Sequence, residues 1–270
     1  MKKFIVNSES QIDLKNFDPE DTNKLLKDDI KEEYSNLQKK LVDLQELFYA
    51  SKKFSLLIVL QGMDCSGKDG TVKKTLGGLN LNGIKVESFK QPTPEELGHD
   101  YLWRVHKVAP KKGDITVFNR SYYEDVLVTR VHHIIDDKAA FNRFNEINKF
   151  EEYLVNNNTL VLKFFLNISK DFQKQKLESR LETPEKHWKF SAADLAERKF
   201  WDEYQKYYED VLSNCSTEKA PWHVVPANNR WFRNYIVLKT IVNTLEGLDL
   251  KFPEIDGDIQ KLIEEVKESN

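Results

Sequence analysis

The sequence predicts an α/β protein whose five-stranded parallel sheet is covered by helices on both faces and carries a helical lid. Five short apolar runs are typical of strands buried on both faces, and helical patterns separate them along the chain. A glycine-rich turn also joins the first apolar run to the helix that follows it. This alternation favours parallel pairing, because each parallel connection has to cross the sheet.

The domain plan follows from the order of these patterns. Residues 1–24 are polar and are expected to form an arm. Residues 25–50 repeat apolar side chains at spacings of three and four, starting at Leu26, which predicts a long helix. That helix either lies on the core of its own chain or makes a subunit contact. Residues 25–248 are expected to form one domain and residues 249–270 a charged tail.

The remaining elements are predicted in turn from apolar runs and helical spacing. The expected strands cover residues 54–61, 84–89, 114–119, 159–168 and 222–227. The expected helices cover residues 100–107, 122–133, 139–157, 169–182 and 192–213.

The composition excludes several classes of protein. The chain has 270 residues, 31% of them charged, and a net charge of −3, so no global basic field points to nucleic acid or an anionic membrane. Two cysteines suit a reducing cytosol. No apolar run reaches the roughly 20 residues of a membrane span. We expect a cytoplasmic protein without a nucleic-acid or membrane partner.

The first candidate site is the loop GMDCSGKDG at residues 62–70, which carries the pattern G-x-x-x-x-G-K between a strand and a helix. Glycines let backbone N–H groups converge on phosphate oxygens, and the lysine adds a point charge. The alternative is a tight structural turn. The candidate phosphate-binding residues are Gly62, Ser66, Gly67, Lys68, Asp69 and Gly70.

Two carboxylates in this loop have different expected roles. Asp69 stands where a Ser or Thr hydroxyl normally reaches Mg²⁺, and negative charge beside phosphate is costly. Asp64 is therefore the better metal candidate, because a carboxylate that faces phosphate needs a cation between them. The alternative is that Asp64 is a turn residue bonded to backbone N–H groups.

A second candidate site is DITVFNRSYYEDVLVTRVHH at residues 114–133, where a strand ends and a helix begins. Ligands of parallel sheets bind at the carboxyl ends of the strands, which places Asn119 and Arg120 beside the glycine loop. Arg120 suits a phosphate clamp, and Glu124 or Asp125 could hold a metal or a nucleotide. The alternative is a solvated helix N-terminus.

Basic residues continue the pattern further along the chain. Lys90 ends the second predicted strand, and Arg104 lies one helix later. Arg180 and Lys189 belong to a basic segment around residues 180–200, which we expect to be a closing lid. A solvated charged hairpin is the alternative.

Five stretches of the chain, taken in order, carry a resemblance to a known family: GMDCSGKDGTVK, SFKQPTPEELGHDYLWR, FNRSYYEDVLVTRVH, LETPEKHWKFSAADLAERKFWDEY and APWHVVPANNRWFRN. Together they resemble the second family of polyphosphate kinases over roughly residues 30–247. The resemblance implies a P-loop kinase-like three-layer fold with a mobile lid. It also implies transfer of phosphoryl groups between inorganic polyphosphate and nucleotides.

The resemblance implies a role for each matching residue. Asp64 looks like the family's metal-binding and catalytic carboxylate, and Lys68 like its phosphate-binding lysine. The basic residues around the phosphates would be Lys90, Arg104, Arg120, Arg130 and Arg180, with Lys189 in the lid. Asn119 departs from the aspartate of many members, so a second metal carboxylate would come from Glu124, Asp125 or solvent.

The implied cofactor is Mg²⁺, with Mn²⁺ as an alternative, and the implied partners are inorganic polyphosphate and nucleoside mono-, di- and triphosphates. Glu124 resembles the branch that accepts both mono- and diphosphates, so ADP, GDP and AMP are expected acceptors and ATP or GTP products. We also expect a homodimer or homotetramer. An ATP-dependent nucleoside or nucleotide kinase and a non-catalytic P-loop nucleotide-binding regulator are the alternatives.

Overall fold

The computed structural model describes residues 2–8 and 10–269, and it confirms the predicted α/β class. Five parallel strands form one sheet in the order β2-β3-β1-β4-β5. Their bounds are β1 (Ser55–Gln61), β2 (Ile84–Ser88), β3 (Ile115–Asn119), β4 (Thr159–Asn167) and β5 (Trp222–Pro226).

The central strand is β1, every residue of which is buried. Its Ile58 pairs with Val117 of β3 on one side and with Leu162 of β4 on the other. By contrast, no residue of β2 is buried; this strand lies at one edge of the sheet, where only β3 pairs with it. The carboxyl ends of β1 and β3 lie next to each other, and the glycine-rich loop and Arg120 follow them directly.

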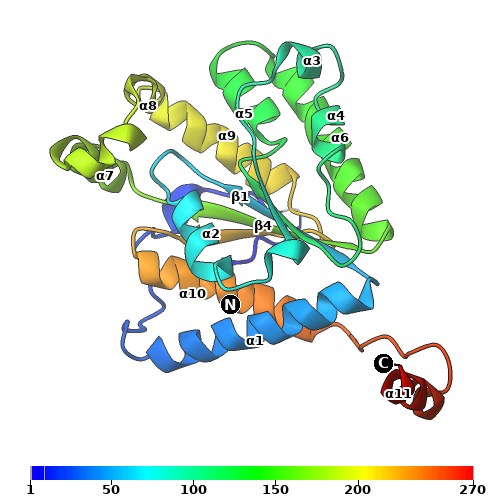
Figure 1. Cartoon of the computed structure of the whole chain (residues 1–270). Coiled ribbons are helices and arrows are strands. Elements are labelled where there is room, and N and C mark those ends of the chain that lie inside the picture. Colours follow the sequence, from blue (N-terminus) through cyan, green and yellow to red (C-terminus); the bar gives the residue numbers. More distant parts are fainter. Residues whose placement is uncertain (1, 9, 270) are drawn as a thin grey trace.

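Helices cover both faces of the sheet, as Figure 1 shows. One layer contains α1 (Lys31–Ser51), α2 (Lys68–Leu76) and α10 (Arg230–Glu246), and the other contains α5 (Glu124–Val131), α6 (Asp137–Asn156) and α9 (Trp201–Asn214). The remaining α-helices are α3 (Pro94–Leu97), α4 (Trp103–His106), α7 (Lys170–Glu182), α8 (Ala192–Arg198) and α11 (Ile259–Glu268). In the described part of the chain, no helix is long and apolar enough to span a membrane.

The long helix α1 starts later than predicted and lies on its own chain. Turns precede it, since Asn23 and Lys24 have left-handed backbone angles and the side chain of Asp29 accepts a hydrogen bond from the Leu26 N–H. Leu26 is exposed and lies outside the helix, whereas Leu41 and Phe48 are buried in the core. Of the two alternatives for this helix, packing on the core is the one that the structure shows.

The N-terminal segment packs against the domain, which corrects the expectation of a polar arm over residues 1–24. Phe4, Val6 and Leu14 are buried, and the Val6 N–H donates to the Trp222 carbonyl of β5 at 2.9 Å. Phe4, Ile5 and Val6 are consecutive, whereas Ile12, Leu14 and Phe17 lie singly among polar residues. Their burial depends on contacts such as those with Trp222 and Phe232, which composition alone does not reveal.

Two further predicted helices differ from the structure. The helix expected over 192–213 is two helices, α8 and α9, because Arg198 donates to the Lys170 carbonyl of α7 and keeps α8 with the lid, while Trp201 is buried in the core. The helix expected over 100–107 is the single turn α4. The lid therefore consists of α7, the 3₁₀ helix Pro184–Lys189 and α8.

Candidate active site

The glycine-rich loop follows β1 so tightly that side chains would not fit at two positions. A Cβ atom on Gly62, whose φ is +145°, would lie 2.7 Å from the Leu166 carbonyl oxygen. One on Gly67, whose φ is +91°, would lie 2.0 Å from an Arg233 nitrogen. Cys65 takes a left-handed φ of 70° although it carries a side chain. Backbone strain of this kind is common at ligand sites.

Lys68 lies folded over the loop. Its ammonium group donates hydrogen bonds to the carbonyls of Gly62 at 2.7 Å and Met63 at 3.3 Å, and the residue is 8% exposed. Burial lowers the pKa of Lys68, with Arg120 acting in the same direction and the carboxylates of Asp64 and Glu124 opposing it. The lysine is thus held at the site by carbonyl oxygens and is free of a direct ion pair among the described residues.

Arg120 pairs with Asp64 across the gap between β3 and the glycine-rich loop. The two groups are 2.5 Å apart, and Arg120 has a left-handed φ of 62° at the end of its strand. Burial opposes ionisation, yet the nearby carboxylates of Glu124 and Asp64 raise the pKa of Arg120. Burial raises the pKa of Glu124, whereas the charges of Arg120 and Lys68 act to lower it. Two cations and two carboxylates therefore interact at the carboxyl ends of β1 and β3.

Asn119 and Asp69 lie against each other. The Asn119 side-chain amide donates to the Asp69 carboxylate at 2.5 Å. Asp69 is the unusual residue of the loop, and Asn119 is the position where an aspartate is common in the family that the chain resembles. A carboxylate is therefore still present at this edge of the sheet, but it belongs to Asp69 of the loop and not to position 119 at the end of β3.

Two cavities open around this centre. The first, of about 690 Å³, is strongly basic: nine Lys or Arg side chains face only two carboxylates. Its charged lining consists of Asp64, Lys68, Asp69, Lys90, Arg120, Lys176, Arg180, Lys186, Lys189, Arg230 and Arg233. Cys65, Gly67, Gly70 and Asn119 also line it. We call it the basic cavity.

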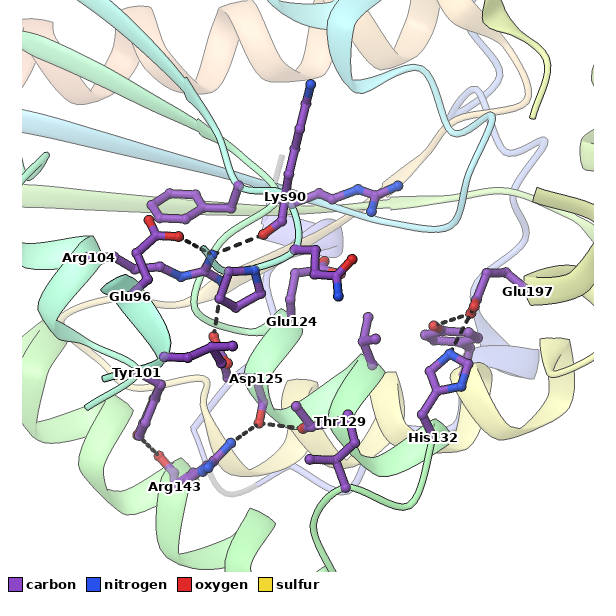
Figure 2. A pocket seen from close by; sticks show the side chains of 18 of the residues that line it. Lys90, Glu96, Tyr101, Arg104, Glu124, Asp125, Thr129, His132, Arg143 and Glu197 are labelled. Carbon is purple, nitrogen blue, oxygen red and sulfur yellow. Dashed lines mark hydrogen bonds and ion pairs between the residues drawn. The ribbon is translucent and has the colours of Figure 1, made fainter. Parts of the chain in front are cut away.

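The second cavity, of about 1150 Å³, has mixed character. Its lining includes seven carboxylates, four Lys or Arg residues and several aromatic and apolar side chains. Figure 2 shows part of this mixed cavity, with Glu124 and Asp125 on α5 and with Glu197 of α8 bonded to His132 at another part of the wall. The basic and mixed cavities share Asp64, Phe89, Lys90 and Arg120. Groups bound in the two cavities would meet at these residues.

Arg104 organises one wall of the mixed cavity. It is 8% exposed, donates to the Lys90 carbonyl at 2.9 Å and lies 3.6 Å from the Asp125 carboxylate (Figure 2). Burial raises the pKa of Asp125 to about 6, although Arg104 and Arg143 oppose this. One Asp125 oxygen is buried without a hydrogen bond. Asp125 thus belongs to the Arg104 side of the cavity and not to the glycine-rich loop.

The segment that the sequence predicts as a lid borders the basic cavity on one side. Arg180 of α7 contacts the Asp194 carboxylate of α8 at 2.9 Å and the Lys189 carbonyl at 3.0 Å. Both Arg180 and Lys189 line the basic cavity, as the sequence predicts. Gln173 of α7 donates to the Asp64 carbonyl at 3.1 Å, so the lid is also bonded to the glycine-rich loop.

Two sequence-predicted residues do not reach either cavity. Arg130 is 2% exposed and pairs with Asp137 at 2.8 Å and Asp210 at 2.9 Å, which ties α5 to α6 and α9. Its position late in α5 turns it away from the cavities. Ser66 is fully buried inside the loop, and its carbonyl accepts a hydrogen bond from Arg233.

The sequence reasoning missed three cations of the basic cavity. Lys176 comes from α7, and Arg230 and Arg233 come from α10, whereas Lys186 lies in the basic segment that the sequence predicts as a lid. The two arginines lie in NNRWFRN, directly after the last strand, where the carboxyl-end rule for parallel sheets could have indicated them. Lys176 has no such signal, because charged residues are frequent on exposed helices.

The carboxylates at the shared edge are suited to a cation that substrate phosphates help to hold. Among residues 2–8 and 10–269, no three His, Cys, Asp or Glu side chains form a cage for a metal. Mg²⁺ is commonly bound by one or two carboxylates together with phosphates and water. Asp64 and Glu124, which interact electrostatically beside Arg120, fit that requirement.

Comparison with known proteins gives consistent results. The sequence model described as "Polyphosphate kinase 2 (PPK2)" matches residues 24–253. The AMP/ADP-polyphosphate phosphotransferase of Meiothermus ruber is 46% identical over 97% of this chain and 99% of its own length. The ADP-polyphosphate phosphotransferase of Rhodopseudomonas palustris is 44% identical over 83% of each chain. The crystal structure of polyphosphate kinase 2 from Arthrobacter aurescens TC1 superposes with a TM-score of 0.93 at 41% identity, covering 98% of this chain and 95% of that one.

Proposed function

Because the chain belongs to the polyphosphate kinase 2 family, we propose that it reversibly transfers phosphoryl groups from inorganic polyphosphate to nucleotides. One observation supports this reaction above all. A cavity with nine cations adjoins a mixed cavity, and the two share Asp64, Lys90 and Arg120. Polyphosphate is a chain of repeated negative charges, so the basic cavity suits the donor. The mixed cavity suits the nucleotide acceptor.

The chemistry needs little beyond charge neutralisation and positioning. A phosphate acceptor has a second pKa of about 6, so at neutral pH it is already an oxyanion and needs no general base. Lys68 and Arg120 would neutralise the oxygens of the transferred group, and the lid would exclude water. Asp64 and Glu124 are the residues that would hold Mg²⁺, with Mn²⁺ as an alternative. When bound, the metal supplies charge neutralisation between the phosphates.

The lining of the mixed cavity and the name of one relative support the proposed acceptor range. The carboxylates of the mixed cavity can accept hydrogen bonds from the ribose hydroxyls and base amino groups of a nucleotide. The phosphates of that nucleotide would lie beside the residues that the two cavities share. The Meiothermus ruber protein is named for both AMP and ADP. We propose ADP, GDP and AMP as acceptors, with ATP and GTP as the final products.

We also propose a homodimer or homotetramer. Val42 and Tyr49 lie one heptad apart on α1 and are 39% and 37% exposed, beside Gly78 and Gly83. Exposed apolar groups that lie together can contribute to a subunit contact. Light scattering on a Val42→Lys, Tyr49→Lys double variant would show a smaller assembly, and an unchanged mass would exclude this face.

The function is tested by nucleotide chromatography after incubation with Mg²⁺, long-chain polyphosphate and either AMP or ADP. We expect ATP in both mixtures. If ATP formed from ADP but not from AMP, polyphosphate would still be the donor, but AMP would not be an acceptor. If polyphosphate gave no product while ATP phosphorylated a nucleoside or a monophosphate, the chain would be an ordinary nucleoside or nucleotide kinase. Binding without turnover of any kind would indicate a non-catalytic regulator.

A further inference from the structure

Arg233 of α10 is buried directly beneath the glycine-rich loop. It is 4% exposed, and its Nη1 donates to the Ser66 carbonyl at 2.9 Å. The same guanidinium would collide with a Cβ atom on Gly67 at 2.0 Å and lies 3.5 Å from one built on Gly70. It therefore supports the segment that leads from the loop into the first turn of α2.

The charge of Arg233 has no carboxylate partner among the described residues. Its other hydrogen bonds, from Nε at 3.1 Å and Nη2 at 3.0 Å, go to the neutral side-chain oxygen of Asn234. Nearby Arg230 adds a second positive charge. Because an uncompensated buried charge is costly, these neutral partners leave the Arg233 guanidinium favourable for an anion.

The other buried arginines differ in this respect. Arg104 lies within 4 Å of Asp125 and Glu96, and Arg130 pairs with Asp137 and Asp210. Only Arg233, among the arginines classed as buried in residues 2–8 and 10–269, has no such pair. It is also one that lines the basic cavity, which neither of the other two does.

We propose that Arg233 is a positioning residue for the polyphosphate donor: it fixes the Ser66–Gly70 backbone, and the donor's negative charge compensates its guanidinium. This proposal rests on the proposed function and adds a residue to it. Asn234 has a matching role, since its amide oxygen holds the guanidinium in place without cancelling its charge. A carboxylate at position 234 would accept the same hydrogen bonds from Arg233. It would also neutralise the guanidinium, so that an external anion would no longer be favoured there.

The decisive variant is therefore Asn234→Asp, which keeps the acceptor oxygen and adds a negative charge. We expect its melting temperature without ligand to equal or exceed that of the wild type. The Kd for inorganic tripolyphosphate, measured by calorimetry without nucleotide, should rise about tenfold, as should the KM for polyphosphate. The KM for ADP should change by less than about twofold.

Arg233→Gln removes the charge and also shortens the side chain, so that the donor to the Ser66 carbonyl is lost, and the tripolyphosphate Kd should rise about 10- to 100-fold. Arg233→Lys should recover part of that loss. The control is Gln45→Ala, which removes buried hydrogen bonds between α1 and Asn80 outside both cavities and should lower the melting temperature without changing the Kd.

An unchanged tripolyphosphate Kd in folded Asn234→Asp protein would overturn the role of Arg233 while leaving the proposed function intact. A wild-type protein that neither binds tripolyphosphate nor forms ATP from polyphosphate would overturn both. A lower melting temperature for Asn234→Asp would show that Arg233 does not lack a counter-charge, and would also contradict the proposal.

Discussion

At the scale of single residues, Lys68 carries the clearest prediction. Its ammonium group is held by two carbonyls of the loop, without an ion pair that its removal would leave unmatched. Lys68→Met should therefore keep the melting temperature within a few degrees. Phosphoryl transfer should fall by about 10²–10³-fold, the usual effect of removing one electrostatic contact to a transition state. Circular dichroism and the ATP assay together measure both effects.

Two results would contradict this role for Lys68. Loss of folding in Lys68→Met would make the lysine structural, and near-normal turnover in a folded variant would place the reacting phosphate elsewhere. Gln45→Ala serves again as the control, because it disturbs packing between α1 and Asn80 without touching a cavity.

Cys65 gives a second prediction at this scale. Burial raises the pKa of its thiol to about 11, with Arg180 opposing and Asp64 adding to the effect. The thiol is thus protonated at pH 8, although it lines the basic cavity. Iodoacetamide should react on the order of a hundredfold more slowly than with free cysteine. Mass spectrometry of the labelled peptide over time tests this, and fast labelling would show a thiolate.

Single residues were predictable where a strand end fixes their position. Asp64, Lys68 and Arg120 follow β1 or β3 directly, and the structure brings them together. Arg130 was assigned by resemblance and is too far along α5 to share that edge; it binds Asp137 and Asp210 instead. Side-chain direction on a helix depends on tertiary packing, which one sequence does not specify.

At the scale of elements, β5 contains a histidine that makes stability depend on pH. His223 is 6% exposed and lies 3.2 Å from the Lys163 carbonyl. Burial lowers its pKa to about 4, and the charge of Lys163 acts in the same direction. The unfolded chain takes up a proton near pH 6.5, whereas the folded chain does not. The folded state is therefore fully stable above pH 6.5 and loses stability as the pH falls toward 4.

The corresponding variant is His223→Gln, which does not titrate. Between pH 8 and pH 5, the wild type should lose about 2 kcal/mol more of its free energy of unfolding than the variant. Urea denaturation at the two pH values measures the difference. Equal losses in the two proteins would mean that His223 is protonated in the folded state.

The C-terminal helix α11 is expected to contribute neither to stability nor to activity. None of its side chains is buried, and Figure 1 shows it projecting from the end of the chain, away from the sheet. Deleting residues 254–270 should change the melting temperature by less than about 1 °C and leave ATP formation unchanged. A large loss of stability or activity would show that this tail contacts the domain in solution.

Elements were predictable to within a few residues wherever burial on both faces produced a continuous apolar run. The apolar runs alone predicted four of the strands. The fifth strand, β2, lies where it was predicted but is exposed at the sheet edge instead of buried. The failures share a cause. The break between α8 and α9, and the burial of Phe4 and Val6, depend on contacts with distant segments.

At the scale of the whole molecule, two cavities of different charge meet at Asp64 and Arg120, and we propose that each holds one substrate. Composition gave no sign of it, since the net charge of −3 hides a local cluster of nine cations. The cations of that cluster come from the lid, the glycine-rich loop, the carboxyl ends of the strands and α10. These segments are far apart in the sequence, and only folding brings their charges together.

The most direct test is the pair of KM values for two single variants, one for each cavity. Lys186→Gln removes a cation of the basic cavity, and His132→Ala removes a ring from the wall of the mixed cavity. We predict that the first raises the KM for polyphosphate about fivefold with little effect on ADP, and that the second does the reverse. If both variants raised the same KM, the two substrates would not occupy separate cavities.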